Sequence, residues 1–191
     1  MNIPQVKIAI SGKMGSGKTT ACKYLNTKIP GLDNDKLARP LYDIAWNVFG
    51  MSRDESAKDR NLLIRIGNAL RSIDNQVFPK ALVTRLPGKR GVIVDDLRMK
   101  YELDILKKAG FLTLRLQIDP TLQEQRIRRT YPDMYQKHLD NQNTETEIDL
   151  DDYEDHFDYI INITDDGMEK FEEQLYEFYR MVVDKQFINR Y

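Results

Sequence analysis

Cysteine is almost absent from this chain of 191 residues, in which Cys22 is the only one. A single cysteine cannot form a disulfide within the chain, and cysteine-rich zinc sites are excluded as well. Long hydrophobic runs are also missing, because no apolar stretch approaches the roughly 20 residues that cross a bilayer. Residues 1–5 have neither the basic start nor the apolar core of a secretory signal. We therefore expect a cytoplasmic protein without a membrane partner.

An overall excess of charge is missing too, since the formal net charge is -1, but the charges are unevenly distributed. Residues 53–129 contain 17 lysines and arginines against 10 acids, whereas residues 145–158 contain eight acids and no lysine or arginine. The basic middle is suited to attract a phosphorylated small molecule, and the acidic end would repel a nucleic-acid backbone. We therefore predict no nucleic-acid partner and interpret the acidic segment as a solvated surface.

Short apolar runs alternate along the chain with stretches of helical period. Strands are predicted at residues 6–11, 92–94, 112–118 and 159–163, and a weaker candidate at 29–32 contains Pro30 and Gly31. Helices are predicted at residues 18–27, 37–49, 62–73, 103–109, 121–130 and 168–185. This alternation predicts a three-layer α/β fold in one domain, with a central parallel sheet of about five strands and helices on both faces.

A glycine-rich segment, residues 12–19, matches G-x-x-x-x-G-K-[ST] without a gap between the first strand and the first helix. Its spacing allows successive backbone N–H groups to surround a phosphate, which bulky side chains would prevent. The following helix adds the positive end of its dipole. We therefore predict a P-loop NTPase fold that binds ATP through Gly12, Lys13, Met14, Gly15, Ser16, Gly17, Lys18, Thr19 and Thr20.

A magnesium site is expected beside this loop. The Thr19 hydroxyl can coordinate Mg²⁺, and Asp95 and Asp96 follow the predicted strand at residues 92–94. An acid at the end of a neighbouring strand is suited to hold the ion or its water shell. Paired acids also serve as helix caps, so one of the two aspartates is expected to be structural.

Arginines recur outside the phosphate loop, and guanidinium groups bind phosphate bidentately while they remain charged. They lie in the second helical segment, after the acid pair and in the helix at 121–130: Arg60, Arg65, Arg71, Arg98, Arg126, Arg128 and Arg129. As a group they favour a kinase, which needs a second anion site and mobile cations, over a signalling switch or a motor.

Further segments follow the phosphate loop in a fixed order: residues 37–41, 48–50, 59–63, 66–67 with Arg71, 94–99 with Glu102, Ile105 and Gly110, 138–147, and 157–162. With these segments the chain resembles the deoxynucleoside monophosphate kinases of bacteriophages over most of its length. It departs from their pattern at Arg39, where an acid is common, and at Tyr42, where a lysine is common.

The resemblance implies phosphoryl transfer from ATP to a deoxynucleoside 5′-monophosphate, which yields the diphosphate and ADP, in a host cytoplasm if the chain is phage-encoded. It further implies a single kinase domain over residues 1–191, with an acceptor-binding insertion near 35–86 and a lid near 121–146. In this scheme Lys18 lies along the β–γ bridge and Arg126 and Arg129 neutralise the transferred group. The acceptor phosphate would be bound by Arg60, Arg71 and Arg98.

Two other functions stay open at this point. A different small-metabolite kinase, with dephospho-coenzyme A as its substrate, shares much of this layout, and a P-loop nucleotide switch would use the same loop without a phosphorylated product. Trp46 is expected to pack in the core, because it lies between Ala45 and Val48 on an apolar helical face. The broadly apolar helix at 168–185 packs on the sheet in this interpretation, with a homodimer interface as the alternative.

Overall fold

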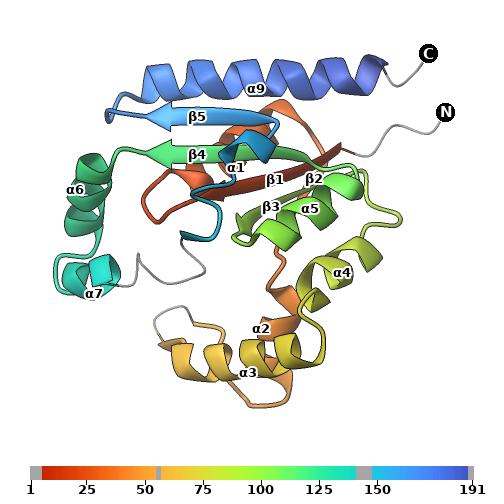
Figure 1. Ribbon diagram of the computed structural model, residues 1–191, viewed down its shortest axis with the longest axis vertical. Helices are drawn as coiled ribbons and strands as arrows, with labels where there is room; N and C mark the ends of the chain where they lie inside the picture. Colours follow the sequence, from red (N-terminus) through yellow and green to blue (C-terminus); the bar gives the residue numbers. More distant parts are fainter. Residues whose placement is uncertain (1–5, 55–56, 141–147, 189–191) are drawn as a thin grey trace.

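The computed structural model describes residues 6–54, 57–140 and 148–188. Its centre is a five-stranded sheet in the order β2-β3-β1-β4-β5, in which every neighbouring pair is parallel (Figure 1). The strands are β1 (Val6–Gly12), β2 (Leu32–Asp35), β3 (Gly91–Leu97), β4 (Leu112–Ile118) and β5 (Tyr159–Ile163). Because all strands are parallel, their carboxyl ends share one edge of the sheet, where ligands of such folds bind.

The weakest predicted strand was misplaced. A strand was predicted at 29–32, but β2 begins only at Leu32. Gly31 has a φ of 87°, and Pro30 has no N–H to donate to a ladder, so the chain turns at these residues before the strand begins. The predicted run at 92–94 is longer than expected, since β3 extends to Leu97 and includes both aspartates.

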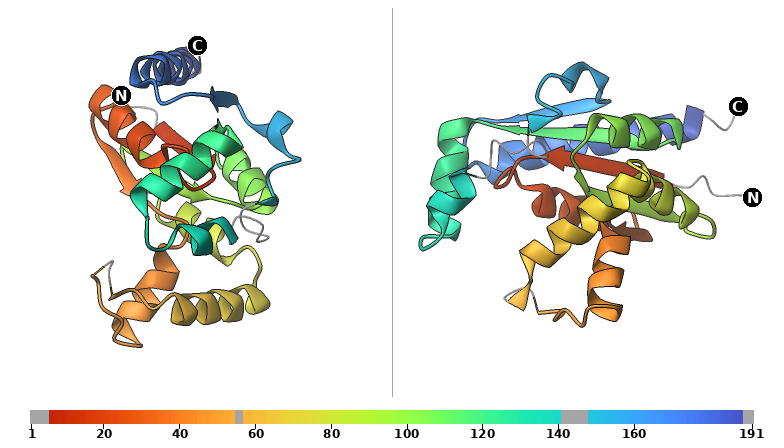
Figure 2. Two further views of the ribbon diagram at one scale, coloured as in Figure 1. Left: turned by 90° about the vertical axis from the view of Figure 1, so that its left-hand side faces the viewer. Right: turned by 60° about the horizontal axis from the view of Figure 1, so that its bottom comes forward.

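Helices cover both faces of the sheet, which confirms the predicted three layers (Figures 1 and 2). On one face, α1 (Lys18–Lys28) and α9 (Met168–Ile188) bury Leu25 and Phe178 against Ile8 of β1. On the other face, α4 (Val77–Thr84) and α5 (Lys100–Lys108) bury Leu82 and Leu103 against β3. Burial of a side chain of this size contributes about 1.5–3 kcal/mol, so these two cores fix the layers.

Two helices between β2 and β3 extend away from the sheet, below it in Figure 1. They are α2 (Arg39–Asn47) and α3 (Arg60–Ile73), and they share a small core of their own around Ala45, Leu63 and Ile66. The Asp59 carboxylate caps α3 by accepting the Leu62 N–H at 3.0 Å. We call α2 and α3 the arm.

Two further helices follow β4 at the same edge of the sheet as the P-loop: α6 (Pro120–Thr130) and α7 (Tyr135–Asp140). The chain then passes through a short 3₁₀ helix (Glu154–His156) into β5. Within the described ranges no helix is long and apolar enough to span a bilayer.

The segment at residues 148–158, which we call the acidic strap, differs from the predicted solvated surface. Leu150 and Phe157 are buried in the core on the α5 face. The Asp158 carboxylate accepts hydrogen bonds from the Thr113 N–H at 2.9 Å and from its hydroxyl at 2.8 Å. The Asp149 carboxylate likewise accepts the Lys100 N–H at 2.7 Å. The prediction of a solvated surface is therefore wrong for Asp149 and Asp158, whereas Asp152 and Asp155 are exposed and residues 145–147 lie outside the described residues.

Candidate active site

The phosphate loop joins β1 to α1, and three of its glycines are required by its geometry. Gly15 and Gly17 have φ angles of 81° and 89°, in the left-handed region where other residues are strained. At Gly12 a Cβ would come within 2.9 Å of the Leu116 backbone oxygen and 2.4 Å of the Ser16 Oγ. The loop is therefore a cradle that admits no larger residue at these positions, as anion binding by backbone N–H groups requires.

Lys18, the first residue of α1, reaches back over the loop. Its Nζ donates to the carbonyl oxygens of Gly12 at 2.5 Å and Lys13 at 2.9 Å. The ammonium is thus held where a bound phosphate chain would meet it. Six of the predicted ATP-binding residues line a cavity of about 760 Å³ beside the loop, which we call the donor cavity: Met14, Gly15, Gly17, Lys18, Thr19 and Thr20.

The two arginines predicted as mobile lid residues are already fixed beside the loop. The Arg126 guanidinium donates to the Gly15 carbonyl at 2.9 Å and to the Asp166 carboxylate at 2.7 Å. Arg129 donates to the same carboxylate at 3.0 Å. These hydrogen bonds, that from Arg126 foremost, hold the pKa of Asp166 below its usual range. Both arginines line the donor cavity, but in this state they pair with Asp166.

Asp166 belongs to a part of the donor cavity that the sequence analysis did not identify. The turn after β5 and the start of α9 contribute Asp166, Gly167, Met168 and Phe171. In the sequence, the one indication that these residues form part of a site is the acidic turn after the apolar strand β5, and such turns are common at the ends of strands.

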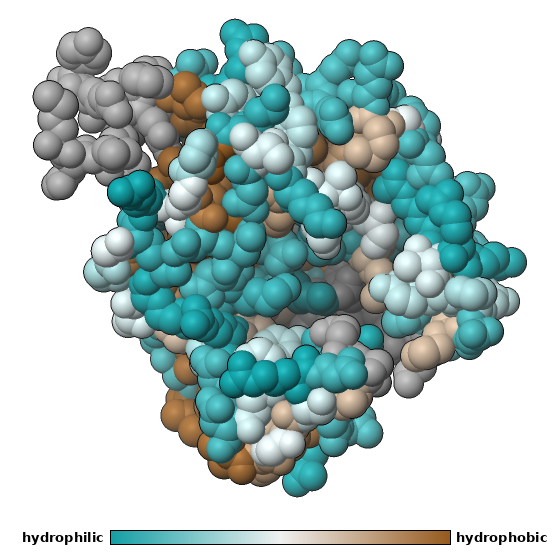
Figure 3. Space-filling view, turned by 180° about the vertical axis from the view of Figure 1, so that it is seen from behind, coloured by the Kyte–Doolittle hydropathy of each residue, from teal (hydrophilic) through white to brown (hydrophobic). Residues whose placement is uncertain are grey.

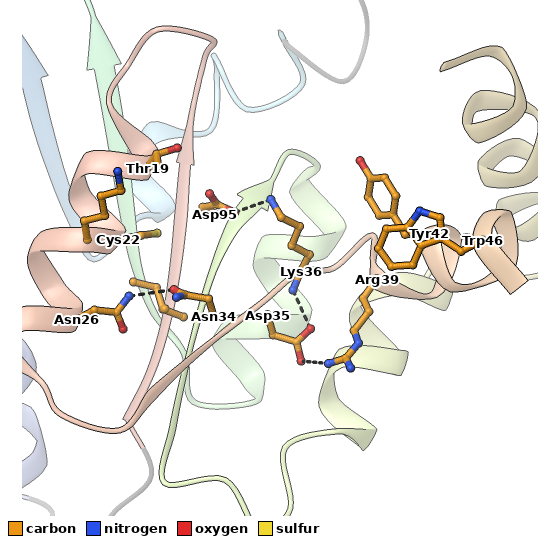
Figure 4. Close-up of a pocket in the computed structure, with 12 residues that line it drawn as sticks. Thr19, Cys22, Asn26, Asn34, Asp35, Lys36, Arg39, Tyr42, Trp46 and Asp95 are labelled. Atoms are coloured by element: carbon orange, nitrogen blue, oxygen red, sulfur yellow. Dashed lines mark hydrogen bonds and ion pairs between the residues drawn. The ribbon is translucent and has the colours of Figure 1, made fainter. Parts of the chain in front are cut away.

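The two aspartates at the end of β3 have different surroundings. Asp96 is half-buried, and its carboxylate accepts the backbone N–H groups of Leu37 at 2.9 Å and Ala38 at 3.0 Å. Burial raises the pKa of Asp96. Asp95 lies 3.2 Å from the Lys36 ammonium and, together with Thr19, lines a cavity of about 560 Å³ between α1 and α2 (Figure 4).

This geometry fits a magnesium ion. The P-loop cradle has no room for a Cβ at Gly12, and a hydroxyl and a carboxylate oxygen, the hard ligands that Mg²⁺ prefers, line one cavity beside it. Thr19 and Asp95 are therefore suited to hold the ion, whereas the Asp96 carboxylate holds the start of the arm.

A third cavity, of about 350 Å³, lies on the α5 side of the sheet between the arm and the body, and we call it the acceptor cavity. Arg71 and Arg98 line it, and the Arg71 guanidinium lies 4.8 Å from the centre of the Phe78 ring. Arg98 also lines the donor cavity, so this cation stands between the two. Arg60, the third predicted acceptor residue, is exposed at the start of α3 and lines neither cavity within the described part of the chain.

A buried carboxyl lies on the floor of the acceptor cavity. Glu102 accepts the backbone N–H groups of Arg98 at 3.0 Å and Met99 at 3.1 Å. Burial raises the pKa of Glu102 to about 7 in spite of these hydrogen bonds. Glu102 thus fixes the backbone that carries Arg98, a role that its spacing in the sequence did not reveal.

The acidic strap contacts the phosphate loop directly. Asp151 pairs with the Lys13 ammonium at 2.5 Å and with the Arg115 guanidinium at 2.7 Å. Arg115 is buried on β4, and it also donates to the Ser11 Oγ at 2.9 Å. The strap therefore braces the loop from the side opposite to α6. Sequence reasoning missed this network, because 138 residues separate Lys13 from Asp151.

The view from behind the molecule shows the side on which α1 lies, opposite to α5. Figure 3 shows that this face is hollowed and largely hydrophilic, with brown apolar patches above and below the hollow.

Together the sheet order, the phosphate loop and the cation-lined cavities define a P-loop protein with a kinase-like fold. The chain belongs to the AAA_18 family, described as "AAA domain", whose family model matches residues 8–149. No curated protein matches the chain in sequence.

Solved structures share the fold at low identity. TT1252 from Thermus thermophilus is 15% identical with a TM-score of 0.63, over 95% of this chain and 97% of that one. Shikimate kinase from Acinetobacter baumannii, in complex with shikimate, is 16% identical with a TM-score of 0.56, over 96% of each chain. Dephospho-CoA kinase from Campylobacter jejuni is 13% identical with a TM-score of 0.50, over 92% of this chain and 96% of that one.

Proposed function

We propose that the protein transfers a phosphoryl group from ATP to a deoxynucleoside 5′-monophosphate, giving the diphosphate and ADP. The observation that carries this proposal is the position of Arg98, which lines both the donor cavity and the acceptor cavity. A kinase must bring two anions together at one point, and a shared guanidinium lowers their repulsion there. Two structures with the same fold are named as kinases of small molecules, which supports the reaction class.

In the donor half, the P-loop backbone and Lys18 bind the triphosphate. Thr19 and Asp95 would hold Mg²⁺, which when bound neutralises charge on the β- and γ-phosphates. Arg126 and Arg129 line the same cavity, and they would exchange Asp166 for the phosphates as the transferred group gains charge. The lid of this proposal comprises α6 and α7; residues 141–146 of the predicted lid lie outside the described residues.

In the acceptor half, the predicted insertion at 35–86 supplies the arm and α4, and the acceptor lies between these helices and α5. Arg71 and Arg98 bind its phosphate, and Phe78 and Leu63 offer apolar walls for the sugar and base. The attacking phosphate oxygen is largely ionised near neutral pH, so no general base is needed. Positioning and electrostatics supply most of the rate.

A coupled assay of ADP release tests this proposal. We expect stimulation by at least one deoxynucleoside monophosphate among the four common bases and modified pyrimidines, and none by dephospho-coenzyme A. Loss of that stimulation in Arg98→Ala, with ATP binding retained, would tie it to the shared arginine. Stimulation by dephospho-coenzyme A alone would identify the other kinase, and ATP binding without any stimulating acceptor would favour the nucleotide switch.

A further inference from the structure

The cavity between α1 and α2 has features that the proposed function does not use. It lies on the α1 face of the sheet, whose core includes its lining residue Ile93, whereas the acceptor cavity lies on the α5 face. The two cavities meet at the base of the arm, where Lys36 and Tyr42 line both of them. Thr19 and Asp95 form one end of it, and the arm forms the other (Figure 4). Its volume of about 560 Å³ falls within the usual range of small-molecule sites. We call it the α1–α2 cavity.

The arm contributes an aromatic wall to this cavity. Tyr42 and Trp46 lie one helical turn apart on α2, with ring centres 5.5 Å from each other. Trp46 is half-buried and lies outside the hydrophobic cores, so the prediction that it packs in the core was wrong. Cations lie over both rings, Arg53 at 4.7 Å from the Trp46 centre and Lys58 at 4.6 Å from the Tyr42 centre. Such a wall is suited to stack a flat aromatic ligand.

The opposite wall is polar and neutral. The Asn26 amide, on α1, donates to the Asn34 amide oxygen, on β2, at 3.0 Å, and both side chains line the cavity (Figure 4). Each amide combines an N–H₂ donor with a C=O acceptor. A paired set of this kind can hydrogen-bond the edge of a nucleobase, which also alternates donors and acceptors.

The charged side chains of the lining are three cations, Lys23, Lys36 and Arg39, against two carboxylates, Asp35 and Asp95. Arg39 is half-exposed, and its guanidinium lies 3.7 Å from Asp35 and 3.9 Å from Asp43, distances longer than a hydrogen bond. The Asp35 carboxylate forms ion pairs with the Arg85 guanidinium at 3.3 Å and the Lys89 ammonium at 3.6 Å. Arg39 can therefore donate to a phosphate bound in the cavity, and the exposed Lys23 adds a further positive charge to the lining.

We propose that the α1–α2 cavity is a second nucleotide site, distinct from the acceptor cavity, which takes a nucleoside monophosphate. The base lies against Tyr42 and Trp46 with its edge toward Asn26 and Asn34, and the phosphate lies at Arg39. A ligand there bridges the P-loop helix and the arm next to Thr19 and Asp95 and contacts Tyr42, which also lines the acceptor cavity, so its occupancy changes turnover. Binding at this site does not depend on the proposed phosphoryl transfer.

Trp46 makes the test direct, since it is the only tryptophan of the chain. Its fluorescence is titrated with dAMP, dGMP, dCMP and dTMP, without ATP or magnesium and with free tryptophan as the absorbance control. We expect saturable quenching by at least one of them. The affinity falls tenfold or more in Arg39→Ala and in Asn26→Ala. It is unchanged in Arg65→Ala, an exposed arginine of the arm that contributes to none of the three cavities formed by the described residues.

Arg71→Ala separates this site from the acceptor cavity. We expect the quenching to persist in that variant, whose substitution lies on the other face of the sheet. Quenching lost in Arg71→Ala but kept in Arg39→Ala would assign the signal to the acceptor cavity and overturn the second site. No quenching by any monophosphate would also overturn it, and ADP release measured on the same preparation then shows whether the proposed function stands.

Discussion

The residues of the phosphate motif contribute to the loop in different ways: some supply a backbone conformation, one supplies space and one supplies charge. Gly15 and Gly17 supply a backbone conformation, whereas Gly12 supplies space against β4. Lys18 supplies charge, and its ammonium is already held by two carbonyl oxygens of the loop. A substitution at a glycine therefore distorts the cradle, and a substitution at Lys18 removes a charge from an intact one.

Lys18→Ala is expected to lower turnover by about 10²–10³-fold, the usual effect of removing one donor that stabilises transition-state charge. The fold is expected to persist, because the side chain is part-buried and its hydrogen bonds to Gly12 and Lys13 lie within the loop, outside the hydrophobic cores. Steady-state kinetics with circular dichroism measure both effects. Lys28→Ala, in the last turn of the same helix, is the matched control with unchanged kinetics. Near-normal turnover in Lys18→Ala would contradict the donor site.

Arg98→Ala is expected to lower kcat/KM for the acceptor by about 10–100-fold, since a charge-assisted hydrogen bond contributes about 1.5–3 kcal/mol. The effect falls mainly on the acceptor, because the loop amides, Lys18 and the magnesium ligands still bind ATP. The KM for each substrate is measured at saturation of the other, with Arg65→Ala as the control. An unchanged acceptor profile would remove Arg98 from the site.

The raised pKa of Glu102 predicts that the free energy of unfolding falls as the pH rises. Burial raises its pKa from 4.5 to about 7, so the folded state favours the neutral carboxyl. Its contribution to stability is fully present below pH 4.5 and is lost as the pH rises through about 7. Relative to Glu102→Gln, we expect the wild-type unfolding free energy to fall by about 2–3 kcal/mol from pH 4.5 to 8. Urea titrations measure it, and the exposed Glu172→Gln is the control; parallel pH curves for wild type and Glu102→Gln would be inconsistent with the buried neutral acid.

At the scale of elements, two connections brace the carboxyl edge of the sheet. Asp96 fixes the first residues of the arm to the end of β3. The acidic strap connects the phosphate loop to β4 through Asp151. One brace thus serves the acceptor side and the other the donor side, so the loop and the arm keep their separation before any ligand binds.

Asp151→Ala tests the brace on the donor side. The substitution removes the Asp151 carboxylate that pairs with the buried Arg115, and we expect a loss of about 1–3 kcal/mol of unfolding free energy, moderated by the partial exposure of Asp151. Asp152→Ala is the matched control on the next residue, because Asp152 is exposed and pairs with the surface ammonium of Lys100. For Asp152→Ala the expected loss of unfolding free energy is below about 1 kcal/mol. Equal losses in urea unfolding for the two variants would show that the strap does not brace the loop.

At the scale of the whole molecule, the sequence predicts what depends on local pattern. The strands with alternating or continuous apolar residues, the helix that follows the phosphate loop and the three layers were all confirmed. One element violates the usual patterns. β2 has the sequence LDND, which lacks β-formers and is held by pairing with β3. In this strand tertiary pairing overrides local propensity.

In the candidate site, too, the parts formed by one local segment could be predicted from the sequence, and the parts formed by distant segments could not. The phosphate loop is one continuous segment, so its residues could be predicted together. The partners of those residues come from distant segments: Asp151 beside Lys13, and Asp166 beside Arg126. A pair of this kind depends on where β4 and β5 lie in the sheet, an order that a single sequence does not encode in any local pattern. The separate surroundings of Asp95 and Asp96 depend on the arm for the same reason.

Because the donor cavity draws on the phosphate loop, α1, α6 and the start of α9, ATP bound there is expected to stabilise the whole molecule. A ligand at 100 times its dissociation constant adds about 2.7 kcal/mol to the unfolding free energy. For a domain of this length that corresponds to a rise in Tm of roughly 5–10 °C. Thermal unfolding with and without ATP and magnesium measures the shift, and Lys18→Ala should reduce it. If limited proteolysis showed protection of α6 and α7 while the Tm stayed constant, ATP would order the lid alone, and the loop would not be the main binding element.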